Sequence, residues 1–171
     1  GASVTFTSPI NFIGFDPASG TPASILNIVS GEAILTNNLS ISLGTIEGTG
    51  TLTMQSNSSL YLRRHSLLYN NTFSGTLNAT VPSTVFYSST NDQSMFIPSS
   101  GAYNNITLEG AGAKTLNNDI ILSGNWTNNA TGTFNAGLHK VTFNGTALQT
   151  IGGSSTTEFK GLSINNNVNF E

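Results

Sequence analysis

The chain has 171 residues, of which 85 are Asn, Ser, Thr or Gly and only 13 are charged, with a formal net charge of −3 at pH 7. Five Lys and Arg residues are too few for a nucleic-acid binder, and the absence of Cys excludes disulfide scaffolds and thiolate metal sites. No apolar run approaches the length that membrane insertion of a helix requires.

Short segments that alternate apolar and polar residues recur from one end of the chain to the other. The first is 3–7, and others follow at 38–42, 50–54, 105–108 and 140–143. Each has the two-residue period of a β-strand with one buried side, and Gly, Asn or Ser bounds it. Good helix formers are scarce, so the sequence predicts an all-β chain forming one domain over residues 1–171.

The clearest internal repeat lies within residues 84–171 and has a 56-residue offset. Five positions keep their character: Val85, Gln93, Tyr103, Ile106 and Leu108 in the first copy, and Val141, Gln149, Phe159, Leu162 and Ile164 in the second. A shorter Gly-Thr-apolar pattern begins at 50, 75 and 132. These intervals indicate coils of roughly 18 to 28 residues, two or three to each long repeat.

Such a repeat predicts a parallel β-helix, or β-solenoid, of about six to nine coils. Inward Ile, Leu, Val and Phe would form one continuous core, and Thr, Ser and Asn would face water. Asn and Gly suit the corners because they tolerate left-handed backbone conformations. The alternative is an antiparallel β-sandwich, which explains the alternation equally well but gives no reason for the repeat.

The repeats resemble those of very large secreted surface proteins of Bacteroidota and their relatives. The resemblance is carried by residues 140–151 with 159–166, by 103–108 with 112–116, and by 123–129. It implies a parallel β-helix exported to the cell surface, in proteins regarded as adhesin-like or structural.

The sequence gives little indication of an active site. The eight carboxylates are spread along the chain, and the best candidate for a catalytic pair is Asp92 with Asp119, whose separation in the sequence is close to one coil. The alternative, that both are solvated corner residues, is favoured. His65 and His139 match no metal-ligand spacing. We therefore expect no enzyme activity, no cofactor and no metal.

Two places suggest a contact with polysaccharide. Arg63 and Arg64 lie among apolar residues and near Tyr61, an arrangement suited to anionic glycans. The favoured explanation is that they are outward-pointing side chains of an ordinary strand. Trp126, the only tryptophan, is either a platform for a sugar or part of the core, and we favour the core. Thr-x-Thr runs suggest an ice-binding surface, but they keep no single offset from coil to coil.

Both ends of the sequence have the pattern of a strand within a solenoid. Val4 and Phe6 alternate with polar residues near the N-terminus, as Val168 and Phe170 do near the C-terminus. The expected partners are therefore neighbouring copies or repeats of the same protein, stacked end to end. The sequence predicts a non-enzymatic, extracellular structural or adhesive protein. The alternatives are a polysaccharide- or ice-binding module and a carbohydrate-active β-helix enzyme.

Overall fold

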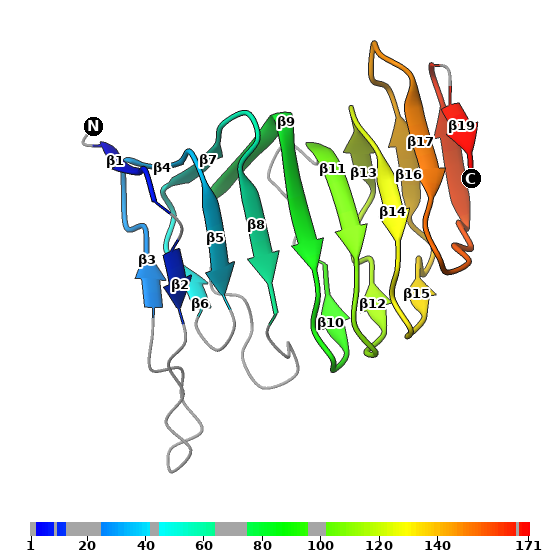
Figure 1. Cartoon of the computed structure of the whole chain (residues 1–171), viewed down its shortest axis with the longest axis horizontal. Coiled ribbons are helices and arrows are strands. Elements are labelled where there is room, and N and C mark those ends of the chain that lie inside the picture. Colours follow the sequence, from blue (N-terminus) through cyan, green and yellow to red (C-terminus); the bar gives the residue numbers. More distant parts are fainter. Residues whose placement is uncertain are drawn as a thin grey trace.

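The computed structural model describes residues 3–8, 10–12, 25–41, 45–63, 75–95, 102–166 and 168–171, and within them every regular element is a β-strand. The strands form a parallel β-solenoid of six to seven turns. Figure 1 shows the coils following one another along the long axis of the molecule. The fold predicted from the sequence is confirmed, and because the strand pairs are parallel, the antiparallel sandwich is excluded.

The strands of successive turns, here called coils, lie on three faces of the solenoid. The first face consists of β1 (Ser3–Phe6), β4 (Glu32–Leu35), β7 (Thr51–Met54), the first part of β9 (Thr76–Tyr87), the first part of β11 (Ala102–Leu108), β13 (Ile120–Leu122), β16 (Lys140–Phe143) and β18 (Gly161–Ile164). The long strands β9 and β11 continue around a corner onto the second face.

The second and third faces are built in the same way. The second face consists of β2 (Ile10–Phe12), β5 (Asn38–Ile41), β8 (Ser59–Leu62), the later parts of β9 and β11, β14 (Trp126–Asn128), β17 (Gln149–Gly152) and β19 (Val168–Phe170). The third face consists of β3 (Ile25–Asn27) with β6 (Thr45–Glu47), and of β10 (Gln93–Ser94), β12 (Lys114–Thr115) and β15 (Phe134–Asn135).

The length of a coil varies along the chain. Ser3 pairs with Glu32 and Glu32 pairs with Thr51, so the first of these coils is about half as long again as the second. Near the C-terminal end, Lys140 pairs with Gly161, in a coil close to the shorter length. The coils thus span nearly the range of lengths expected from the sequence.

The 56-residue repeat does not correspond to a whole number of turns. Val85 lies on the second face, where it pairs with Leu60 and Ile106. Its counterpart Val141 lies on the first face, where it pairs with Ile120 and Leu162. The two copies therefore share a local structure but are rotated by one face about the solenoid axis.

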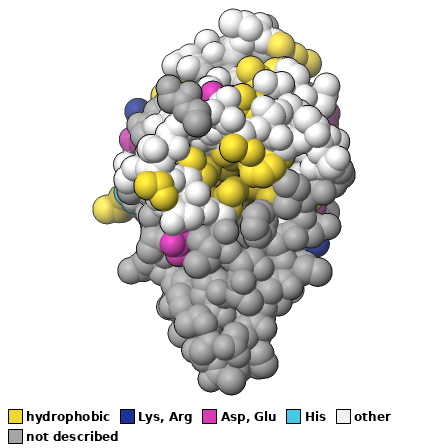
Figure 2. Space-filling model, turned by 90° about the vertical axis from the view of Figure 1, so that its left-hand side faces the viewer, with side chains coloured by type: hydrophobic (Ala, Val, Ile, Leu, Met, Phe, Trp, Pro, Cys, Tyr) yellow, Lys and Arg dark blue, Asp and Glu magenta, His cyan; other side chains and the backbone are white. Residues whose placement is uncertain are grey.

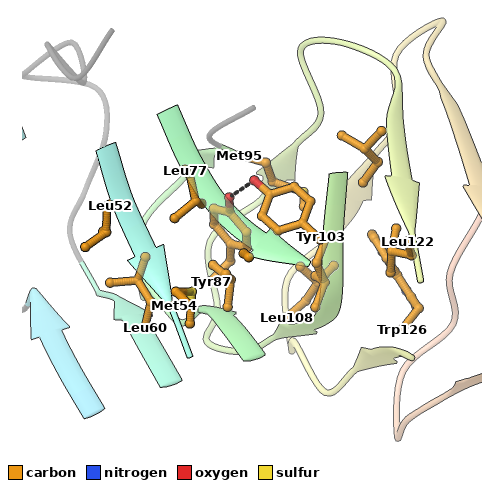
Figure 3. Packing of buried hydrophobic residues seen from close by; sticks show 14 of the residues in the cluster. Leu52, Met54, Leu60, Leu77, Tyr87, Met95, Tyr103, Leu108, Leu122 and Trp126 are labelled. Atoms are coloured by element: carbon orange, nitrogen blue, oxygen red, sulfur yellow. Dashed lines mark hydrogen bonds between the residues drawn. The ribbon is translucent and has the colours of Figure 1, made fainter. Parts of the chain in front are cut away.

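The core is a continuous column of inward side chains contributed by every coil. Leu60, Val85 and Ile106 are consecutive members on the second face, and all are buried. The side chains of Tyr87 and Tyr103 point toward one another inside the solenoid, where their hydroxyls lie 2.7 Å apart in a hydrogen bond (Figure 3). This bond satisfies polar groups that would otherwise make burial unfavourable.

Candidate functional site

Two buried glutamines hold corners of the solenoid. The Oε1 of Gln149 accepts a hydrogen bond from the backbone N–H of Gly145 at 2.8 Å, and its Nε2 donates to the carbonyls of Leu122 at 3.1 Å and Gly124 at 2.6 Å. The contacts join the turn that precedes β17 to the coil before it. Gln149 therefore acts on the backbone of two coils, which leaves its amide no part in binding a ligand.

Gln93 makes the equivalent contacts in the earlier copy of the repeat. Its Oε1 accepts from the N–H of Ser89, again four residues before the glutamine, and its Nε2 donates to the carbonyl of Leu62 at 2.8 Å. The sequence repeat marked both glutamines, but only the structure assigns them this role. We call Gln93 and Gln149 the corner glutamines.

Asp92 and Asp119 do not form the catalytic pair considered from the sequence. Asp92 precedes β10 on the third face and accepts the N–H of Ala113 at 2.9 Å, one coil further on. Asp119 precedes β13 on the first face and accepts the N–H of Lys140, also at 2.9 Å. The two carboxylates thus lie at different corners, where each joins adjacent coils.

Lys114 is a buried cation that the sequence analysis did not single out. Its side chain is fully buried, and its Nζ donates to the carbonyls of Ser89 at 2.9 Å and Gly112 at 2.8 Å. Burial lowers the pKa of Lys114, while the nearby Asp92 carboxylate acts in the opposite direction. Lys114 pairs in register with Gln93 and Phe134, so its inward direction follows from the strand register. Only knowledge of that register would have identified it.

Asparagines form a polar ladder along the outside of the second face. The Oδ1 of Asn105 accepts the N–H of Asn125 at 2.8 Å, and the Oδ1 of Asn125 accepts the N–H of Thr150 at 2.8 Å. The amide of Asn105 also donates to the carbonyl of Ser83 at 3.0 Å. The abundant asparagines thus supply hydrogen bonds between coils as well as turn conformations.

Part of the predicted glycan contact around Arg63 lies within the described residues. Tyr61 lies on the second face, and its ring stacks on that of Phe86 with centroids 4.2 Å apart. The Arg63 guanidinium carbon lies 5.2 Å from the centroid of the Tyr61 ring. Tyr61 and Phe86 are half-buried and Arg63 is exposed. Arg64 lies outside the described residues, and the glycan contact stays a prediction.

Trp126 belongs to the core, which confirms the alternative favoured from the sequence and excludes the platform for a sugar. The side chain is 0% exposed, and its Nε1 donates to the hydroxyl of Thr157 at 3.1 Å. The rings of Phe134 and Phe159 pack edge-on against it, with centroids 4.9 and 5.3 Å away. Trp126 points inward because it is in register with Ile106 and Ile151.

The ends of the solenoid carry apolar side chains that belong to the inward columns. Val4 is in register with the buried Ala33 yet is 58% exposed, and Phe6 packs partly against the core. Figure 2 views this end and shows a hydrophobic patch at its centre.

The C-terminal end has the same character. Phe170, in register with Ile151, is 63% exposed. Leu162 and Ile164 of β18 are each 42% exposed, and the sequence analysis did not include them among the residues of an end-to-end contact. They could have been found from the 56-residue repeat, which aligns Leu162 with Ile106. Val168 pairs through its backbone with Gln149, and its side chain is outside the described residues.

The described residues include no group of three or more His, Asp or Glu side chains placed to hold a metal ion. Within the same part of the chain, no helix has the length and apolarity needed to cross a membrane. The sequence matches no protein-family model, and neither a curated protein nor a solved structure matches it.

Proposed function

We propose that this chain is a non-enzymatic structural segment of an extracellular, adhesin-like surface protein. In this role it is a solenoid rod that separates and presents other parts of an assembly. The observation that carries the proposal is the use made of the polar side chains. Asp92, Asp119, Lys114 and the corner glutamines bind the backbone of their own or a neighbouring coil rather than gathering around a common point.

A rod of this kind keeps its length because each coil is bonded to the next by parallel strand pairs and by side chains. Tracing the register along the first face takes seven steps from Thr5 to Ser163. At about 4.8 Å a step, the two positions lie roughly 34 Å apart. The sides present mainly neutral hydroxyls and amides, which suits a surface exposed to variable ionic conditions.

The rod can be tested by measuring its length in solution. The chain contains no Cys, so Thr5→Cys with Ser163→Cys gives two unique sites for spin labels. Electron–electron double resonance on labelled chain diluted into an excess of unlabelled chain measures only the two labels within one chain. It should give one narrow distance distribution centred at the length of these seven steps and broadened only by the label linkers. A wide distribution would contradict a rigid spacer. Turnover of any polysaccharide that falls in Asp92→Asn or Asp119→Asn would contradict the non-enzymatic role.

Polysaccharide binding is a second candidate, favoured by the stack of Arg63, Tyr61 and Phe86 on the second face. A half-buried aromatic pair beside an exposed guanidinium suits a neutral or anionic sugar chain. Binding to a polysaccharide array should then fall at least tenfold in Arg63→Gln and Tyr61→Ala. Lys160→Gln, which changes another exposed cation, is the matched control. Equal binding by all three variants would exclude this surface.

A further inference from the structure

We propose that the two ends of the solenoid bind each other, so that β18 and β19 of one copy stack against β1 and β2 of a second copy. The contact is head to tail and parallel, and it continues the solenoid from one copy into the next. This inference rests on the proposed structural function and specifies its partner as a second copy of this chain.

The first support is that both end coils have strand edges available for pairing. Within the described residues, β1 pairs with β4 alone and β2 with β5 alone. At the other end, β18 pairs with β16 alone and β19 with β17 alone, in the part of the chain that the structure describes. An edge of this kind carries backbone N–H and C=O groups that a further parallel strand can bond.

The second support is the match between inward positions on the first face. The succession of strand pairings carries Phe6 through Leu35 and onward to Phe143 and Ile164, so Phe6 and Ile164 belong to one inward column. Both β1 and β18 have four residues. Stacking them in this register places Leu162 against Val4 and Ile164 against Phe6, and polar residues face outward between them.

On the second face, the backbone register independently aligns the N-terminal end of the solenoid with its C-terminal end. Ile10 and Phe170 belong to one column, which runs through Leu39, Leu60, Val85, Ile106, Trp126 and Ile151. The same register that joins β18 to β1 therefore brings Phe170, at the end of β19, opposite Ile10, at the start of β2. A copy that docked on one face alone would not satisfy both relations.

The corner between the two faces has an internal precedent. In the first coil three residues separate Phe6 from Ile10, and in the last coil five separate Ile164 from Phe170. A difference of the same size, in the reverse order along the solenoid, occurs where β4 and β5 stack directly on β7 and β8. There three residues separate Leu35 from Leu39, and five separate Met54 from Leu60. The solenoid already accommodates this mismatch.

The absence of charged residues from the end strands also permits stacking. None of the residues in β1, β2, β18 and β19 is charged. Stacking would therefore cover the exposed parts of Val4, Leu162, Ile164 and Phe170 without burying an ion. Since each copy would use one end for one neighbour and the other end for the next, the contact does not close, and it produces filaments rather than dimers.

The test uses two variants that each block one end. Val4→Lys places a charge on the N-terminal end and Leu162→Lys on the C-terminal end. Leu138→Lys, at a 98% exposed side chain in the loop between β15 and β16, is the matched control. Folding of each variant is checked by circular dichroism and by the fluorescence of the buried Trp126. Analytical ultracentrifugation is then performed from about 1 to 300 μM, with electron microscopy at the highest concentration.

The wild type and Leu138→Lys should form particles whose mass grows with concentration, whereas each end variant alone should associate at least tenfold more weakly. An equimolar mixture of the two end variants should stop at twice the 17.9 kDa mass of one chain, because each retains one intact end. A wild type that stays monomeric, or end variants that associate as the wild type does, would overturn the inference. A monomer that keeps the narrow distance between the two spin labels would remove head-to-tail stacking alone, whereas a broad distance would remove the rod itself.

Discussion

The corner glutamines give the sharpest prediction about stability, and Gln149→Met is the most informative change. Methionine keeps the length and volume of the side chain but cannot replace its hydrogen bonds. The carbonyl of Leu122 still accepts from the N–H of Asn144, so the groups that lose the Gln149 amide without this compensation are the N–H of Gly145 and the carbonyl of Gly124. At about 1–3 kcal/mol for each buried group, the free energy of unfolding should fall by roughly 2–6 kcal/mol.

Substitutions at two further glutamines serve as comparisons for this loss of unfolding free energy. Gln93 also shares its carbonyl acceptor, that of Leu62, with a backbone donor, and its contact with the N–H of Ser89 is long at 3.3 Å. Gln93→Met should therefore cost less, about 1–2 kcal/mol. Gln55 is exposed, so Gln55→Met should change stability by no more than about 0.5 kcal/mol.

The assay is denaturant unfolding followed by Trp126 fluorescence. Trp126 is a suitable probe because it is buried and pairs with Ile151, two residues from Gln149. The expected order of midpoints is Gln55→Met close to the wild type, then Gln93→Met, then Gln149→Met. If Gln149→Met unfolds at the same denaturant concentration as Gln55→Met, the corner contacts do not stabilise the fold and the reasoning is refuted.

Three other changes test the packing and electrostatics of the core. Because burial lowers the pKa of Lys114 in the folded state, the unfolded chain binds more protons between that pKa and 10.5. Stability should therefore rise with pH within this interval in the wild type and in the control Lys160→Met. This rise should be smaller in Lys114→Met, and an unchanged slope of denaturation midpoint against pH would contradict it. Gly112→Ala should lower the melting temperature strongly, since a Cβ there would lie 1.8 Å from the carbonyl oxygen of Asn91; a normal melting curve would exclude this close approach. Trp126→Ala should cost about 3–5 kcal/mol in unfolding monitored by circular dichroism, and a cost below about 1 kcal/mol would show that the site is not core.

The alternation of apolar and polar residues was sufficient to predict most of the inward side chains. Leu52, Leu60 and Val141 follow from the two-residue period, because successive side chains of a strand point to opposite sides. Lys114 was missed for a physical reason: β12 has only two residues, too few to show a period. Its direction is fixed by pairing with Gln93 on the coil before it and with Phe134 on the coil after it.

The candidate site was predicted less well than the fold, because its contacts join coils and have no local signature. Asp92 and Asp119 look alike in the sequence, as carboxylates spaced about one coil apart. In the structure they precede strands of different faces, and each accepts a backbone N–H 21 residues later. A separation in sequence becomes a spatial relation only when the length of each coil is known, and the coil that begins at Ser3 is much longer than the one that begins at Glu32.

The rotation of the 56-residue repeat indicates what the repeated sequence specifies. In both copies a strand ends at an aromatic residue, a turn follows, and a corner glutamine binds the N–H four residues earlier. Its Nε2 donates to the carbonyl of the residue paired with that aromatic: Leu62 opposite Tyr87, and Leu122 opposite Phe143. The first copy forms the corner after the second face, and the second copy forms the corner after the first face. Since the same contacts serve two different corners, the repeat specifies how the chain turns and not which face it turns onto. A solenoid built from such corners can change the length of a coil without losing the bonds that join it to the next.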